Sequence, residues 1–196
     1  MGERFDPAKA DHLLDPARKA WYDPDRVLTH LDLGRGRVVA DVGCGPGWFT
    51  LPLAERVAPD GLVYAIDVEE KMLERLMERA KERAVANIRP VLAEEEDEFP
   101  VPSSSCDAAL VASVYHEVDP TSSFANEVRR ILRPGGVCLL IEWRPEPTPV
   151  GPPQHERLSP DDVIREWTAA GFEAAGPVEV GPYHYGIMFH AVKGSA

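Results

Sequence analysis

The chain has 196 residues, of which 28% are charged, and a formal net charge of -12 at pH 7. This length suits one compact domain with a sizeable core. An acidic surface repels phosphate backbones and anionic membrane surfaces, so we expect neither nucleic acid nor a membrane as a partner.

The three cysteines, Cys44, Cys106 and Cys138, lie far apart and show no CxxC spacing. We interpret them as small buried hydrophobic residues, and we expect neither a metal site nor a disulfide framework. No apolar run approaches the roughly 20 residues of a membrane span. These features predict a cytoplasmic protein.

An N-terminal helical cap is predicted over residues 1–35. Asp6-Pro7 and Asp23-Pro24 each place a capping side chain directly before a proline at the first helical position. Two helices should therefore precede the first strand, with Trp21 and Tyr22 between them.

The core, residues 36–143, alternates short β-branched runs with longer helical stretches. The clearest helix spans 69–85, where apolar residues recur at helical spacing and the other face is charged. This rhythm predicts an α/β fold with a parallel sheet covered on both faces. The predicted strands are 38–42, 62–67, 88–93, 107–112 and 137–143.

The same start signal at Asp119-Pro120, within the core, and at Ser159-Pro160, beyond it, predicts helices over 120–132 and 160–170. Between them, the proline-rich segment 144–158 should be an ordered loop without regular structure. A hairpin is predicted in the last part, 159–196, with strands over 176–180 and 187–192.

The strand 38–42 contains Asp41 and runs directly into a turn, Gly43-Cys44-Gly45-Pro46-Gly47. Glycines let a ligand approach the backbone N–H groups of such a turn. A dinucleotide fingerprint would require a third glycine where Trp48 stands. A carboxylate aimed at the turn suits a cationic ligand better than a pyrophosphate, which it would repel.

The next strand ends in Asp67, beside the tip of the first strand. A carboxylate there could accept hydrogen bonds from both hydroxyls of an unphosphorylated ribose. The two acidic residues and the glycine turn together predict a site for a positively charged nucleoside.

Because of the motif from Asp41 to Gly47 and the acidic residue Asp67, the sequence resembles the class I S-adenosylmethionine-dependent methyltransferases. It is most similar to the ubiquinone/menaquinone-biosynthesis type. The resemblance covers residues 38–143, including 114–118 and 132–136. It implies a Rossmann-like, seven-stranded and mostly parallel sheet with an antiparallel C-terminal strand. It also implies S-adenosyl-L-methionine as methyl donor and S-adenosyl-L-homocysteine as product.

The resemblance further implies a set of cofactor-binding residues. An acidic residue after the third strand contacts the adenine amine in this family, which matches Glu94 or its neighbour Glu95. The full expected set is Asp41, Gly43, Cys44, Gly45, Gly47, Asp67, Val68, Glu94, Glu95 and Ser113.

The acceptor side is predicted from topology. Ligands of open parallel sheets lie beyond the carboxyl ends of the strands, so Tyr115 could orient an acceptor and His116 could act as general base. The antiparallel last strand should return Tyr183, His184 and Tyr185 to the same edge. Trp143, His155 and Arg157 are further candidates for substrate contacts, and a packing role is the alternative for every residue in this group.

The predicted function is methyl transfer to a small-molecule acceptor by a monomer or homodimer. One alternative is a catalytically silent binding module with this fold. Another is an NAD-dependent oxidoreductase, which Trp48 disfavours. Arsenite methylation would use cysteines as ligands, but Cys106 and Cys138 lie within predicted strands.

Overall fold

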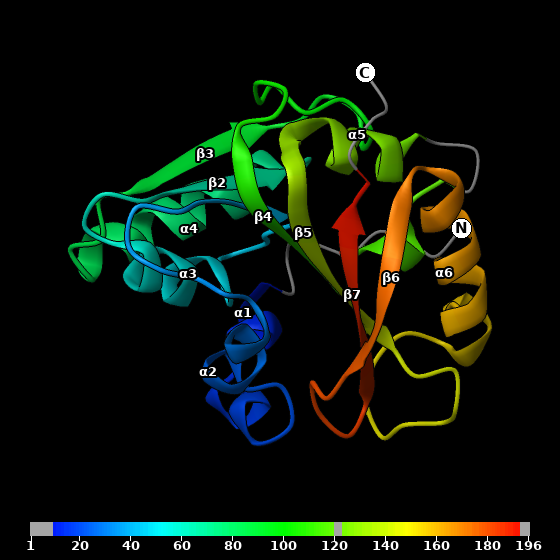
Figure 1. The fold of residues 1–196 in the computed structure, drawn as a ribbon. Coiled ribbons are helices and arrows are strands. Elements are labelled where there is room, and N and C mark those ends of the chain that lie inside the picture. Colours follow the sequence, from blue (N-terminus) through cyan, green and yellow to red (C-terminus); the bar gives the residue numbers. More distant parts are fainter. Residues whose placement is uncertain (1–9, 120–122, 193–196) are drawn as a thin grey trace.

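The computed structural model describes residues 10–119 and 123–192. Its centre is a seven-stranded sheet with the order β3-β2-β1-β4-β5-β7-β6 (Figure 1). Strand β7 runs antiparallel to β5 and β6, and the other paired strands are parallel. The strands are β1 Val38–Val42, β2 Leu62–Asp67, β3 Ile88–Leu92, β4 Cys106–Ala112, β5 Leu132–Trp143, β6 Phe172–Val178 and β7 His184–Ala191.

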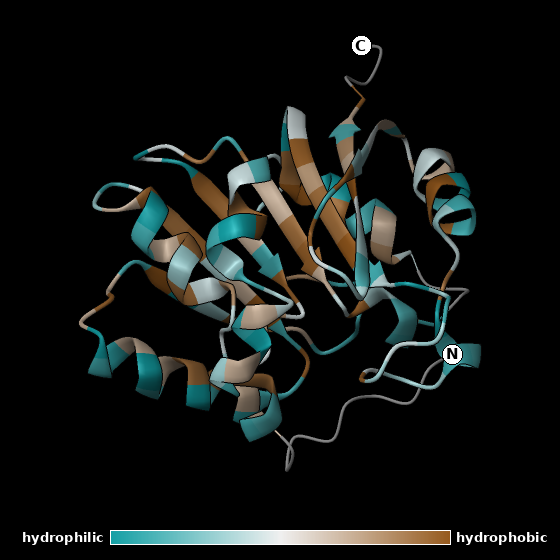
Figure 2. Ribbon diagram, turned by 90° about the horizontal axis from the view of Figure 1, so that it is seen from below, coloured by the Kyte–Doolittle hydropathy of each residue, from teal (hydrophilic) through white to brown (hydrophobic). Residues whose placement is uncertain are grey.

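Side chains of the central strands alternate between two apolar layers, as the pleat of a sheet requires. Val39, Val63 and Leu110 belong to the cluster that also holds the apolar faces of α3 (Thr50–Val57) and α4 (Glu70–Glu82). Their neighbours Ala40 and Val111 belong to the cluster that holds α5 (Phe124–Ile131) and α6 (Pro160–Ala169). Figure 2 shows the apolar strands between helices that turn a polar face outward. The predicted α/β class with both faces covered is confirmed.

Capping residues set several of the helix boundaries. Ser159 accepts a hydrogen bond from the backbone N–H of Asp162, and α6 begins at Pro160 as predicted. Asp23 likewise caps α2 (Pro24–Val27). Helix α4 ends at Glu82, three residues before the predicted end, because Ala84 has a left-handed backbone (φ 55).

Two predicted helix starts involve residues outside the described part of the chain. Asp6-Pro7 lies wholly outside it. Asp119 is described but Pro120 is not, and α5 begins at Phe124.

The N-terminal cap lies at the end of the sheet where β5 finishes and β7 begins (Figure 1). Trp21 stacks on His184 at the start of β7 and packs against Trp143 at the end of β5. The short helical turns of the N-terminal cap are α1 Ala10–Leu13, η2 Pro16–Ala20, α2 and η3 Leu28–His30.

The C-terminal hairpin differs from the prediction in its boundaries. Strand β6 begins at Phe172, four residues early, and β7 at His184, three residues early. Pairing with β5 extends β7, since His184 and Tyr185 lie opposite Trp143 and Glu142. His184 and Tyr185 are therefore strand residues and not part of a loop.

The proline-rich loop contains one short helical turn, η5 (Gln154–Glu156), and is otherwise irregular. No helix within the described ranges is long and apolar enough to cross a membrane.

Candidate functional site

The turn after β1 depends on glycine for its conformation and for space. Gly43, Gly45 and Gly47 all have positive φ, at 69°, 51° and 87°. A Cβ on Gly43 would lie 2.5 Å from a methyl group of Val114, and one on Gly47 would collide with Leu76. These positions would strain any other residue.

Asp67 fastens this turn to the second strand. One carboxylate oxygen accepts a hydrogen bond from the N–H of Gly45 (2.7 Å), and the other accepts from that of Glu69 (2.9 Å). Burial raises the pKa of Asp67, and these two hydrogen bonds oppose that rise. A carboxylate has about four acceptor positions, so capacity for ligand hydroxyls remains.

Asp41 is a second carboxylate close to the same turn. Its side chain is buried and accepts a hydrogen bond from the hydroxyl of Thr50 (2.6 Å) at the start of α3. Burial raises the pKa of Asp41 to about 7, against the lowering effect of Thr50 and with a further rise from the charge of Asp67. A nearby cation would favour the ionised form.

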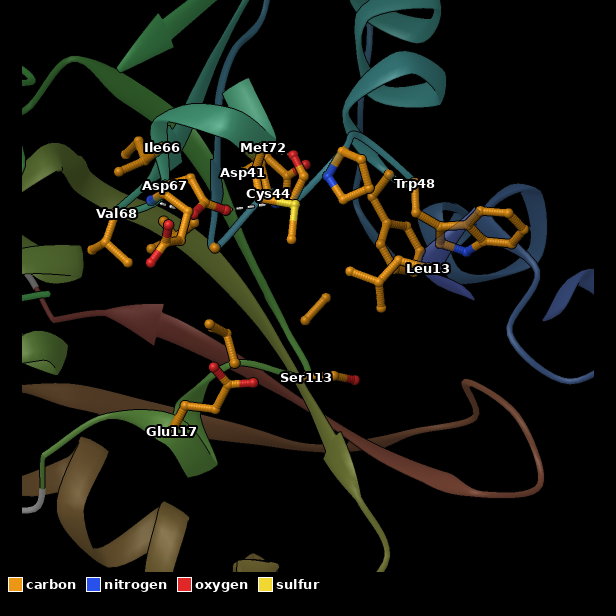
Figure 3. Close-up of a pocket in the computed structure, with 18 of the residues that line it drawn as sticks. Leu13, Asp41, Cys44, Trp48, Ile66, Asp67, Val68, Met72, Ser113 and Glu117 are labelled. Carbon is orange, nitrogen blue, oxygen red and sulfur yellow. Dashed lines mark hydrogen bonds between the residues drawn. The ribbon is translucent and has the colours of Figure 1, made fainter. Parts of the chain in front are cut away.

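Both carboxylates line one cavity beyond the carboxyl ends of β1, β2 and β4 (Figure 3). Its walls come from the N-terminal cap, the glycine turn, the residues after β2 and β3, and the segment after β4. Besides the turn, the lining includes Leu13, Arg18, Tyr22, Trp48, Phe49, Val68, Glu69, Met72, Ala93, Glu96, Phe99, Ser113, Val114, Glu117, Val118 and Phe124.

Arg18 is the basic residue among these walls, against five acidic residues. Its guanidinium lies over the rings of Trp21, Tyr22 and Trp48 and donates a hydrogen bond to the carbonyl of Leu13. Burial lowers the pKa of Arg18. The cavity therefore combines apolar surface with an excess of negative charge, which suits a cationic ligand.

Most of the predicted cofactor residues lie at this cavity. Asp41, Gly43, Cys44, Gly45, Asp67, Val68 and Ser113 line it, and Gly47 shapes the turn without lining it.

The exceptions are Glu94 and Glu95, whose side chains are exposed and do not line the cavity. After β3 the chain folds back through a bridge between Glu95 and Glu98, which directs Glu96 and Phe99 to the wall. The acidic run 94–98 thus contributes Glu96 to the cavity wall, and not Glu94 or Glu95 as predicted.

His116 and Tyr115, the candidates for catalysis, are not among the lining residues. The Nδ1 atom of His116 is hydrogen-bonded to the buried carboxylate of Glu142, at 2.9 and 3.1 Å. The hydroxyl of Tyr115 donates a hydrogen bond to Glu166 (2.8 Å) on α6. The ionisable residue of this segment that lines the cavity is their neighbour Glu117, which sequence reasoning did not single out.

Three of the six residues that are candidates for contacts with the methyl acceptor lie together behind Tyr22. The ring of His184 stacks on Tyr22 at 4.0 Å and packs against Trp143 at 4.1 Å, and Tyr183 packs against Trp21. Tyr22 separates this cluster from the cavity, and its hydroxyl lies 3.2 Å from that of Ser113.

The imidazole of His184 is fully buried in this cluster. Among the described residues, neither of its ring nitrogens has a hydrogen-bond partner. Burial and the charges of Arg18, Arg144 and Arg157 lower the pKa of His184 to about 3, so the ring is neutral near pH 7.

The structure does not bring Tyr185, His155 or Arg157 to the cavity. The hydroxyl of Tyr185 donates to the carbonyl of Leu158, and the side chain of His155 is 82% exposed. Arg157 donates to loop carbonyls, including that of Glu146 at 2.7 Å, and so holds the proline-rich loop together. These three residues have structural or surface positions.

No group of three or more His, Cys, Asp or Glu residues within 10–119 and 123–192 could hold a metal ion. Cys44, Cys106 and Cys138 are buried free thiols, as predicted. Burial raises the pKa of Cys106 to about 11, so its thiol is a poor ligand near pH 7.

The chain belongs to the methyltransferase domain family, whose match covers residues 39–136. A crystal structure of a SAM-dependent methyltransferase from Aquifex aeolicus is similar at 33% identity, with a TM-score of 0.91, over 96% of this chain and 100% of that one. The fold and the methyl donor that the sequence resemblance implied are those of this family.

Curated relatives are similar over part of their length. A demethylmenaquinone methyltransferase from Geobacillus stearothermophilus is 29% identical over 59% of this chain and 49% of its own. Nocamycin O-methyltransferase from Saccharothrix syringae is 32% identical over 80% of this chain and 48% of its own. The chain thus spans about half the length of the curated relatives it matches.

Proposed function

We propose that this chain transfers a methyl group from S-adenosyl-L-methionine to a small-molecule acceptor. The observation that carries the proposal is the cavity beside the glycine turn, where Asp41 and Asp67 are two buried carboxylates. A sulfonium nucleoside with an ammonium group complements that charge. When bound, this cofactor supplies the methyl group on a positively charged sulfonium, whose sulfur leaves as a neutral thioether.

The residues of the cavity fit the parts of such a ligand. Asp67 has acceptor positions left for the ribose hydroxyls, and the backbone of the turn can be approached closely because Gly45 has no Cβ. Val68, Met72 and Phe99 offer apolar surface for a purine. Glu96 replaces Glu94 and Glu95 as our candidate partner of the adenine amine.

A small molecule is the acceptor class that the chain favours. The net charge of -12 disfavours nucleic acid. Relatives named for methylating demethylmenaquinone and nocamycin support a small organic acceptor. The segment after β4 reads Ser113-Val114-Tyr115-His116, without the Asn/Asp-Pro-Pro motif of enzymes that methylate exocyclic amines of nucleic acids. We propose that the protein acts as a monomer or homodimer.

Calorimetric titration and thermal melts with S-adenosyl-L-homocysteine and with NAD test the cofactor assignment. We expect S-adenosyl-L-homocysteine to bind and to raise the melting temperature, and NAD to do neither. Labelled methyl donor incubated with a pool of metabolites then tests transfer. Binding without transfer to any metabolite would favour a binding module, and stabilisation by NAD alone would favour an oxidoreductase.

A further inference from the structure

A row of three ionisable side chains leads from the cavity into the core of the protein. Glu117 belongs to the turn η4 (Tyr115–Glu117) after β4 and lines the cavity, across from Asp67 (Figure 3). The Nε2 atom of His116 lies 3.8 Å from a carboxylate oxygen of Glu117. On the other side of the same ring, Nδ1 meets Glu142 at 2.9 Å.

Glu142 is held rigidly at the end of β5. Its side chain is fully buried, and it accepts hydrogen bonds from the backbone N–H groups of His116 (3.2 Å) and Trp143 (3.1 Å). The Nδ1 atom of His116 lies within hydrogen-bond distance of both carboxylate oxygens of Glu142, at 3.1 and 2.9 Å, and this contact sets the orientation of the ring. The imidazole therefore directs its other nitrogen toward Glu117.

The charges around His116 favour its protonated form. Burial lowers the pKa of His116, but the attraction and the hydrogen bond of Glu142 outweigh it, and Glu117 and Glu156 add to the rise. His184 is a second imidazole nearby, and burial keeps it neutral near pH 7. A buried imidazolium between two carboxylates would hold the side chain of Glu117 in a defined position.

We propose that Glu117 accepts the proton of the methyl acceptor, that His116 and Glu142 are positioning residues for it, and that the acceptor carries a weakly acidic hydroxyl on an aromatic ring. This rests on the function proposed above. The apolar neighbours Val114, Val118 and Phe124 in the same cavity wall suit a flat ring.

The reaction balances in one displacement. The acceptor O–H proton moves to a carboxylate oxygen of Glu117 as the acceptor oxygen bonds to the methyl carbon. The bond between that carbon and the sulfonium sulfur breaks, and the sulfur keeps the electron pair and becomes a neutral thioether. Glu117 then releases its proton to solvent when the product leaves, so one proton is produced for each methyl group transferred.

Two naphthols of similar shape and different acidity provide the test. At pH 8, 1-naphthol is mostly protonated and needs a base, whereas 4-nitro-1-naphthol is already ionised. We expect Glu117→Gln to lower kcat for 1-naphthol about a hundredfold, in the range of general-base contributions. The same variant should change kcat for 4-nitro-1-naphthol less than about fivefold and leave the affinity for S-adenosyl-L-homocysteine within about twofold.

Matched variants separate the base from a structural effect. Glu117→Asp keeps a carboxylate and should recover part of the rate, and Glu82→Gln on the exposed end of α4 should change neither rate. Glu142→Gln should lower kcat for 1-naphthol selectively, with KM little changed, which a folding defect would not do.

Equal losses with both naphthols, or no loss with either, would overturn the role of Glu117. Transfer to neither naphthol by the unmodified chain, while S-adenosyl-L-homocysteine still binds, would overturn the acceptor class alone. Failure of that ligand to bind would instead contradict the proposed function.

Discussion

The carboxylate of Asp67 accepts a hydrogen bond from the backbone N–H of Gly45 at 2.7 Å, so the end of the second strand holds the turn that follows the first. Asp67 thus fixes the shape of the glycine turn, and we propose that it also presents a charged acceptor to a ligand in the cavity that it lines. A substitution at this position should affect both stability and affinity.

We expect Asp67→Ala to weaken binding of S-adenosyl-L-homocysteine by roughly 1–3 kcal/mol, the cost of removing a charged hydrogen-bond partner. Calorimetric titration measures this loss, and Asp60→Asn is the matched control because the side chain of Asp60 is 75% exposed. Affinity equal to that of the unmodified chain would contradict the ribose assignment.

Binding of the same ligand should strengthen as the pH rises from 6 to 8. The pKa of Asp41 is about 7, and only its ionised form attracts an ammonium group. The association constant should rise about tenfold over this range, as for one group that must be deprotonated. Asp41→Asn should bind more weakly at pH 8 and lose most of this dependence. A profile that stays unchanged in Asp41→Asn would exclude Asp41 as its source.

Gly43→Ala should destabilise the protein by roughly 2–4 kcal/mol. The left-handed backbone costs an L-residue about 1–2 kcal/mol, and the contact with Val114 adds an overpacking penalty. Urea denaturation measures the change. Gly34→Ala, where a Cβ would meet nothing within 4 Å, is the control and should have little effect. Adding Val114→Ala should recover the steric part only.

His184→Phe should raise the free energy of unfolding, because it removes two buried nitrogens that have no partner among the described residues. In the native state the pKa of His184 is about 3, below its value of about 6.5 in an unfolded chain, so the unfolded state binds more protons between these values. Stability should therefore fall as the pH drops from 6.5 toward 3.

The variant His184→Phe should lose part of this acid sensitivity, as thermal melts at pH 5 and pH 7 would measure. His155→Phe, at an exposed position, is the control. A destabilised His184→Phe that binds S-adenosyl-L-homocysteine normally would instead indicate that the imidazole has a partner outside the described residues.

The strands and the glycine turn could be predicted because their signals are local. Strands β1 and β2 have the predicted boundaries, since β-branched runs between turn residues mark buried strands. Asp41 and Asp67 could be placed at the cavity because each lies in the last two residues of a predicted strand. Strand β7 begins three residues before the predicted start at 187, because His184 and Tyr185 are extended through pairing with β5.

The rest of the site depends on contacts between distant segments. Arg18 and Tyr22 reach the cavity only because the N-terminal cap packs across the end of the sheet. Nothing in the spacing of the acidic run distinguishes Glu96 from Glu94, because the direction of each side chain depends on how the loop folds back.

The sequence by itself determined strands β1 and β2, the glycine turn and the position of the two carboxylates beside it, because apolar patterning and steric limits along the chain specify them. Only the tertiary structure decided that His116 turns inward to Glu142 while Glu117 faces the cavity. Adjacent residues in a tight turn point in different directions, and the buried carboxylate on β5, 26 residues away in sequence, determines which one is drawn into the core.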